Sequence, residues 1–136
     1  MDIRSAKRWT LVLNNVESLL DSLTKVGQLV AQAESLETGR LTVCADGGER
    51  PWWHRILGAP RWVISFFALD WRENRARLIF HDEDWSEYRA TDPGEFTDGA
   101  RKPEDEWIAK DRAFEAVREF LESGSRPSWL SYRFVE

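Results

Sequence analysis

Few residues of this chain have types and spacing that could do chemistry. The two histidines are His54 and His81, and the second begins a run of three acidic residues, Asp82, Glu83 and Asp84. Carboxylate oxygens in such a run suit a divalent cation, but a solvated acidic turn at the end of a strand has the same sequence. Two histidines without a defined spacing to other ligands do not predict a zinc site.

The single cysteine, Cys44, lies in a predicted strand, on the same side as Thr42. A cysteine next to a histidine can form a nucleophilic pair, but a small thiol in a strand is typical of a protein core. No phosphate-binding glycine loop and no nucleophile-elbow motif occurs, and Gly47-Gly48 alone indicates a turn. The sequence therefore supports no enzymatic activity, and we expect no cofactor and no bound metal.

Negative charge is concentrated between residues 82 and 106. Ten acidic and three basic side chains give this segment a charge of −7, whereas the whole chain is −5 and the remainder is +2. Direct binding to nucleic acid is disfavoured, because phosphate contact needs a basic face. The segment favours a basic protein partner, although an acidic loop that only keeps the protein in solution has the same composition.

Tryptophan is unusually frequent, with eight residues in the chain. Three lie in predicted strands, where burial in the core is expected: Trp9, Trp62 and Trp129. Five fall in predicted loops or at the ends of elements: Trp52, Trp53, Trp71, Trp85 and Trp107. Tryptophan is enriched at the energetic centres of interfaces, so the second group indicates a binding surface. Packing beneath long loops is the alternative.

Length and composition predict one globular domain over residues 1–136, with 42% hydrophobic and 32% charged residues. A single thiol excludes an internal disulfide framework and a cysteine zinc site. The first residues contain no apolar segment typical of a secretion signal, and no apolar run reaches the ~20 residues of a membrane helix. We therefore expect a cytoplasmic protein.

The order of predicted elements indicates an α+β fold, an antiparallel sheet of about five to six strands with two helices packed on it. A first helix is predicted from a cap at Asn14, with an apolar stripe from Val16 to Ala33 and an end at Thr38-Gly39. Gly27 in this helix is interpreted as a point of close packing on the sheet. The second helix is predicted at Asp111–Ser123. The strands are predicted at Lys7–Leu13, Arg40–Ala45, Arg61–Leu69, Ala76–His81, Trp85–Ala90 and Ser128–Val135.

The chain ends in a distinctive succession of signals. Gly124 follows the second helix and can adopt the left-handed conformation that ends a helix, and Pro127 prevents the helix from resuming. Arg126 is expected to hold a helix carboxylate or a terminal carbonyl group. The final strand then directs Trp129 or Leu130 back towards the core.

This ending resembles the first-numbered immunity protein family of bacterial polymorphic toxin systems. The matching residues are Ala116, Phe120, Leu121, Gly124, Arg126, Pro127 and Leu130, and Tyr132 stands where a tryptophan is usual. The segment Ala76–Ala90 looks like the strand, acidic turn and aromatic-bearing strand of the same family. The likeness is clear over about the last third of the chain and loose over the middle.

The resemblance implies a cytoplasmic inhibitor that binds a co-produced toxin in a one-to-one complex and has no chemistry of its own. In many relatives the toxin is a nucleic-acid deaminase or a nuclease-like domain, which engages its substrate through a basic pocket. An acidic inhibitor with exposed tryptophans would occlude that pocket. The residues that we expect at the interface are Asp82, Glu83, Asp84, Trp85, Glu95, Glu104, Asp105, Trp52 and Trp53.

Two other functions fit the sequence. Small acidic α+β proteins with an early amphipathic helix also resemble the chaperones of type III secretion effectors, which are usually homodimers that wrap an unfolded segment. A metal-dependent hydrolase that uses Asp82 and Asp84 is the third possibility. The immunity-protein and chaperone hypotheses share one property, since both describe an acidic domain that binds another protein.

Overall fold

The computed structural model of the protein describes residues 3–46, 63–81, 86–91 and 107–135. Its strands are β1 (Arg8–Leu13), β2 (Val16–Leu20), β3 (Thr38–Asp46), β4 (Val63–Arg72), β5 (Arg75–His81), β6 (Glu87–Thr91), β7 (Ile108–Ala109) and β8 (Ser131–Val135). They form one eight-stranded sheet in the order β2-β1-β3-β4-β5-β6-β8, with β7 paired to β5. Every strand pair is antiparallel.

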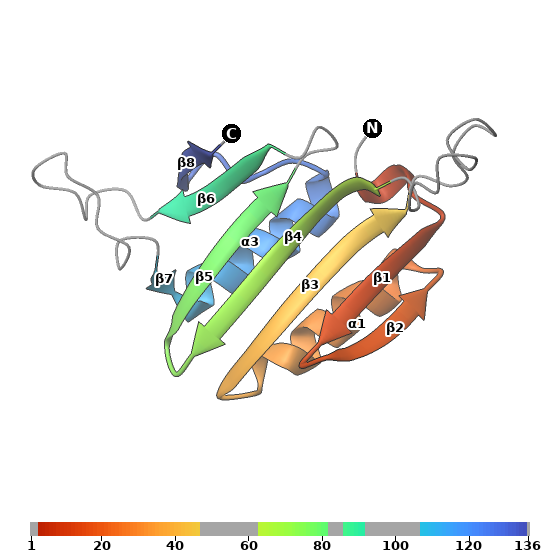
Figure 1. Cartoon of the computed structure of the whole chain (residues 1–136), viewed down its shortest axis with the longest axis horizontal. Coiled ribbons are helices and arrows are strands. Elements are labelled where there is room, and N and C mark those ends of the chain that lie inside the picture. The colour runs from red at the N-terminus through yellow and green to blue at the C-terminus, as the bar shows by residue number, and fades with distance from the viewer. Residues whose placement is uncertain (1–2, 47–62, 82–85, 92–106, 136) are drawn as a thin grey trace, which may run out of the picture.

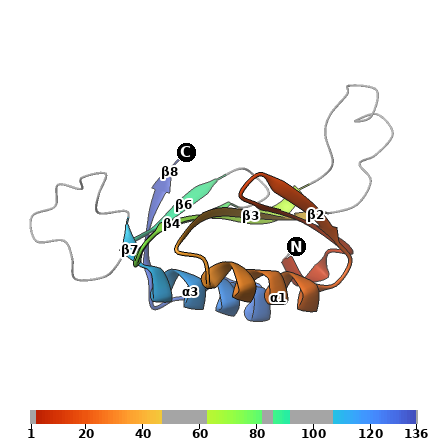
Figure 2. The same ribbon diagram turned by 90° about the horizontal axis from the view of Figure 1, so that it is seen from below.

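Two helices, α1 (Leu23–Glu34) and α3 (Lys110–Ser123), lie on the same face of this sheet (Figures 1 and 2). A short 3-10 helix, η1 (Ile3–Ser5), precedes β1. The predicted α+β architecture is confirmed, and the sheet has more strands than the five to six expected. The additional strands are β2, which the sequence analysis assigned to a helix, and the two-residue β7.

The first helix begins later than predicted. Asn14 and Asn15 have φ angles of 48° and 69° and form the two-residue turn between β1 and β2. Positive φ at both positions is the geometry of a type I′ hairpin turn, which asparagine tolerates better than most residues. The prediction that Asn14 caps a helix starting near Val16 was wrong, because residues 16–20 pair with β1 over their whole length.

The helices bury apolar stripes against the sheet. The part of the predicted first stripe that lies in α1 is confirmed, with Val26, Val30 and Ala33 buried. The interpretation of Gly27 was wrong, since a Cβ atom there would meet nothing within 4 Å. The close approach is at Gly39 instead, where a Cβ atom would lie 2.4 Å from the Trp71 ring.

The core lies between the helices and alternate residues of the central strands. The Phe67 ring meets the Phe120 ring of α3 edge-on, with centroids 6.0 Å apart. Trp71 packs in the same way on Phe114, with centroids 5.1 Å apart. Trp71 does not contribute to the binding surface that the tryptophans of loops and element ends indicated, because β4 continues to Arg72 and the Trp71 side chain is only 2% exposed.

The end of α3 has the predicted form. Gly124 has a φ of 77°, and its amide donates a hydrogen bond of 2.8 Å to the Phe120 carbonyl. Leu130 returns to the core and is 4% exposed, as predicted. The Arg126 guanidinium lies 3.5 Å from the centroid of the Tyr88 ring, which ties the segment after α3 to β6.

Candidate functional site

The candidate site is the face of the sheet opposite the helices, here called the open face. Side chains alternate along a strand, so every second residue points away from α1 and α3. No helix in the described part of the chain covers this side of the sheet (Figure 2). Apart from the buried Thr91, its side chains on β3, β4, β5, β6 and β8 are half-buried or exposed where the structure describes them: Arg40, Thr42, Cys44, Ala68, Asp70, Arg72, Arg75, Arg77, Ile79, His81, Glu87, Arg89, Ser131, Arg133 and Val135.

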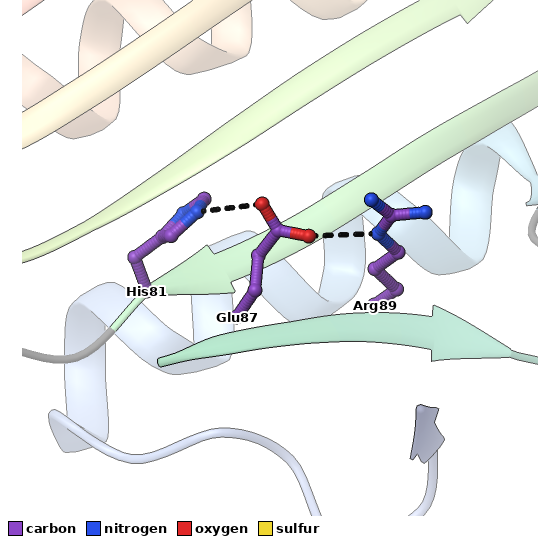
Figure 3. Close-up of polar contacts among 3 residues, drawn as sticks. All are labelled: His81, Glu87 and Arg89. Carbon is purple, nitrogen blue, oxygen red and sulfur yellow. Dashed lines mark hydrogen bonds and ion pairs between the residues drawn. The ribbon is translucent and has the colours of Figure 1, made fainter. Parts of the chain in front are cut away.

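A polar cluster occupies one part of the open face. His81 and Glu87 are partners in the register between β5 and β6, and the His81 ring Nε2 lies 3.2 Å from Glu87 Oε1. Arg89, two residues further along β6, donates from Nε to Glu87 Oε2 at 2.8 Å. Figure 3 shows the Glu87 carboxylate between the other two side chains.

The electrostatics of this cluster keep the carboxylate ionised. Burial pulls the pKa of Glu87 upwards, but hydrogen bonds from Arg89 and His81 and their positive charges outweigh it, so the pKa lies below its ordinary value of 4.5. A carboxylate with a lowered pKa is a weak proton acceptor at neutral pH. The arrangement therefore suits the positioning of Arg89 better than proton transfer.

Two arginines of β5 contact Trp107. The Arg77 guanidinium lies over the Trp107 ring, 5.2 Å from its centroid. Arg75 donates from Nη2 to the Trp107 carbonyl at 2.5 Å. The pairing of β7 with the beginning of β5 brings Trp107 to this place. Trp107 thus supports two arginine side chains, a role that its predicted position in a loop did not indicate.

Positive charge dominates the described open face from β3 to β8. Six arginines lie there, Arg40, Arg72, Arg75, Arg77, Arg89 and Arg133, against the two carboxylates Asp70 and Glu87. Asp70 pairs with Arg40 at 2.8 Å across β3 and β4. This face is therefore opposite in charge to the acidic segment at residues 82–106.

Cys44 lies on the open face with Thr42, as the strand alternation predicted. The expectation of a core thiol was wrong, because its side chain points away from the helices and is half-buried. Burial raises the pKa of this thiol to about 11. The group is consequently protonated at neutral pH and is a poor nucleophile.

The nine residues predicted at the interface, Asp82, Glu83, Asp84, Trp85, Glu95, Glu104, Asp105, Trp52 and Trp53, all lie outside the residues that the structure describes. Their placement as a binding surface stays a prediction. His54 and Trp62 also lie outside it. Of the suggested cation-binding run, only His81 is described, and it contacts Glu87.

Within the described ranges, no three side chains of histidine, cysteine, aspartate or glutamate gather as metal ligands would. None of the helices in those ranges is long and apolar enough to cross a membrane.

The sequence alone did not indicate that arginines gather on the open face. A signal was available for some of them, because Arg75 and Arg77 are two apart in and beside a predicted strand and so share one face. The alignment of Arg89 with Arg133, in the row of Ile79, had no such signal, since it depends on which strands pair and in what register.

Comparison with known proteins adds no relative: no protein-family model matches the chain, and no curated protein is similar to it in sequence.

Proposed function

We propose that this protein is an immunity protein, which binds a cognate bacterial toxin and neutralises it without chemistry of its own. The observation that carries the proposal is the concentration of negative charge between residues 82 and 106, which has a charge of −7 in a chain of net charge −5. Concentrated negative charge attracts and orients a basic protein partner. The resemblance of residues 113–132 to the immunity family supports the same conclusion.

In this proposal the toxin acts on nucleic acid, as a deaminase or a nuclease does, and its substrate groove is basic. Residues 82–85 and the loop Thr91–Glu106 complement such a groove and block it by occupying the space of the substrate. Asp82, Glu83, Asp84 and Trp85 follow β5 directly, so the sheet anchors one end of the segment. The complex forms in the cytoplasm, before the toxin can act on the cell that makes it.

The test is co-expression with the polypeptide encoded immediately upstream, followed by a growth assay and affinity purification. We expect growth to be rescued and a stable complex of equal stoichiometry to be recovered. A well-expressed partner that forms no complex and whose toxicity is unchanged would overturn the proposal. Binding only to an unfolded segment of that partner would favour the secretion-chaperone hypothesis instead.

A charge-reversal variant tests the part played by the acidic segment. Asp82→Lys/Glu83→Lys/Asp84→Lys should abolish rescue if these side chains enter the basic groove. The matched control is Asp111→Lys/Glu115→Lys/Glu122→Lys, which makes the same charge change on exposed positions of α3. Equal loss of rescue in both variants would show an effect of net charge and not of this surface.

A further inference from the structure

Arginine residues directly oppose one another at two places on the open face. Arg72 of β4 is the register partner of Arg75 of β5, and Arg89 of β6 is the register partner of Arg133 of β8. Like charges directly opposite on one face of an antiparallel pair are destabilising. Glu87 offsets the repulsion at Arg89, so Arg72 and Arg75 are the pair that carries the argument. Positions that break a local rule of this kind are expected where a protein binds something.

Three arginines at this end of β4 and β5 have no carboxylate partner among the described residues. Arg75 and Arg77 contact the carbonyl and the ring of Trp107, and Arg72 is exposed. No ion pair within the described ranges joins Arg72, Arg75 or Arg77 to an acidic side chain. The contacts with Trp107 orient the two β5 side chains without neutralising them, so their charges remain available to a partner.

These arginines lie beside apolar side chains of the same open face. Arg72 and Arg75 are register partners on neighbouring strands, about 5 Å apart, and from Arg75 to Ile79 along β5 is about 13 Å. Ile79 and Ala68 lie side by side in the register of β4 and β5 and are half-buried. Val12 and Thr42 extend the same row across β1 and β3.

From this geometry we infer that the open face is a second binding surface, which docks an acidic amphipathic segment of a protein partner. Carboxylates of the partner pair with Arg72, Arg75 and Arg77, and its apolar side chains cover Ile79 and Ala68. Arginine binds carboxylates with two parallel hydrogen bonds, which gives such a contact orientation as well as attraction. This surface is opposite in charge to the acidic segment of the proposed function and does not depend on it.

A polypeptide fits this surface better than a nucleic acid does. Asp70 and Glu87 lie among the arginines, where they would repel a continuous phosphate backbone. One face of the Trp107 ring is already occupied by Arg77, so it does not offer the open platform that a nucleic-acid base would stack on.

The test uses a synthetic helical peptide of about 20 residues, with leucine on one stripe and glutamate on both flanks. Two comparison probes are the same peptide with lysine in place of glutamate and a single-stranded oligothymidine. Binding to the full chain is measured by fluorescence anisotropy at about 50 mM salt, where exposed charges are screened less than at physiological ionic strength. We expect the glutamate peptide to bind most tightly of the three.

The decisive variants carry equal charge changes on opposite sides of the molecule. Arg72→Glu/Arg75→Glu should weaken binding of the glutamate peptide by roughly tenfold or more, because it reverses two charges at the surface. The control is Lys25→Glu/Arg118→Glu, at exposed positions of α1 and α3, and we expect it to change the affinity less than about twofold. Circular dichroism and a melting curve establish that both variants are folded.

Three results would overturn the inference. They are equal weakening in the two variants, no binding of the glutamate peptide, or tighter binding of the oligothymidine than of the peptide. The last result would assign the surface to nucleic acid. None of these outcomes bears on rescue from the toxin, so the inference and the proposed function can fail separately.

Discussion

The two faces of the sheet differ in what their side chains contribute. On the helix side, Phe67 and Phe80 are 0% and 1% exposed, and the Phe80 ring lies 4.8 Å from the Phe120 ring. On the open side, Ala68 and Ile79 are adjacent to these phenylalanines in the same strands and are half-buried among arginines. The helix side of the sheet therefore carries most of the hydrophobic stabilisation. The open face can then hold opposed like charges that lower the stability of the fold.

The largest expected effect tests this division of roles directly. Phe80→Ala should lower the free energy of unfolding by about 3–5 kcal/mol, because it opens a cavity against Phe67 and Phe120. Ile79→Ala, one residue away on the open face, should cost about 1 kcal/mol, since its side chain is only half-buried. Urea unfolding followed by tryptophan fluorescence measures both. Similar losses in the two variants would contradict the comparison.

An intermediate effect is expected at the polar cluster. Glu87→Gln should lower the free energy of unfolding at neutral pH by about 1 kcal/mol, through weaker hydrogen bonds to Arg89 and His81. Because the folded-state pKa of Glu87 is lowered, the carboxylate stabilises the fold fully above 4.5, its ordinary value, and loses this contribution as the pH falls through the lowered pKa. The difference between the two proteins should therefore shrink below that pH.

The measurement is a series of urea unfolding curves from neutral to acidic pH for the original chain and Glu87→Gln. Asp111→Asn, at an exposed position of α3, is the control for the removal of one carboxylate. A difference between Glu87→Gln and the original chain that stays constant down to acidic pH would show that ionisation of Glu87 does not stabilise the fold.

The smallest expected effect has the opposite sign. Arg72→Glu alone should raise the free energy of unfolding by about 0.2–0.5 kcal/mol, because it replaces an opposed pair of like charges with an attractive pair to Arg75. The same substitution should weaken binding of the glutamate peptide. A gain in stability together with a loss of affinity would show that the open face sacrifices stability for binding. Thermal unfolding at low salt, where the charge effect is largest, resolves the first part.

The sequence predicted the elements that are long and bounded by clear signals. The second helix was placed within one residue, since its apolar stripe and Gly124 both have local causes. The pairing of β5 with β6 also followed from short strands adjacent in the sequence. The hairpin at Asn14-Asn15 was misread, because Val16, Leu19 and Leu23 also fit a helical spacing. Only pairing with β1 decides between the two.

The candidate site was predicted least well, for a physical reason. The acidic segment, the number of tryptophans and the alternation that puts Arg75 and Arg77 on one side of a strand follow from composition and from residues close in the chain. The placement of Arg72 opposite Arg75, of Arg89 opposite Arg133 and of Trp107 under Arg77 comes from the folded sheet. Those contacts depend on strand order and register, which burial of the helix-side core determines for the whole sheet and which no local stretch of sequence encodes.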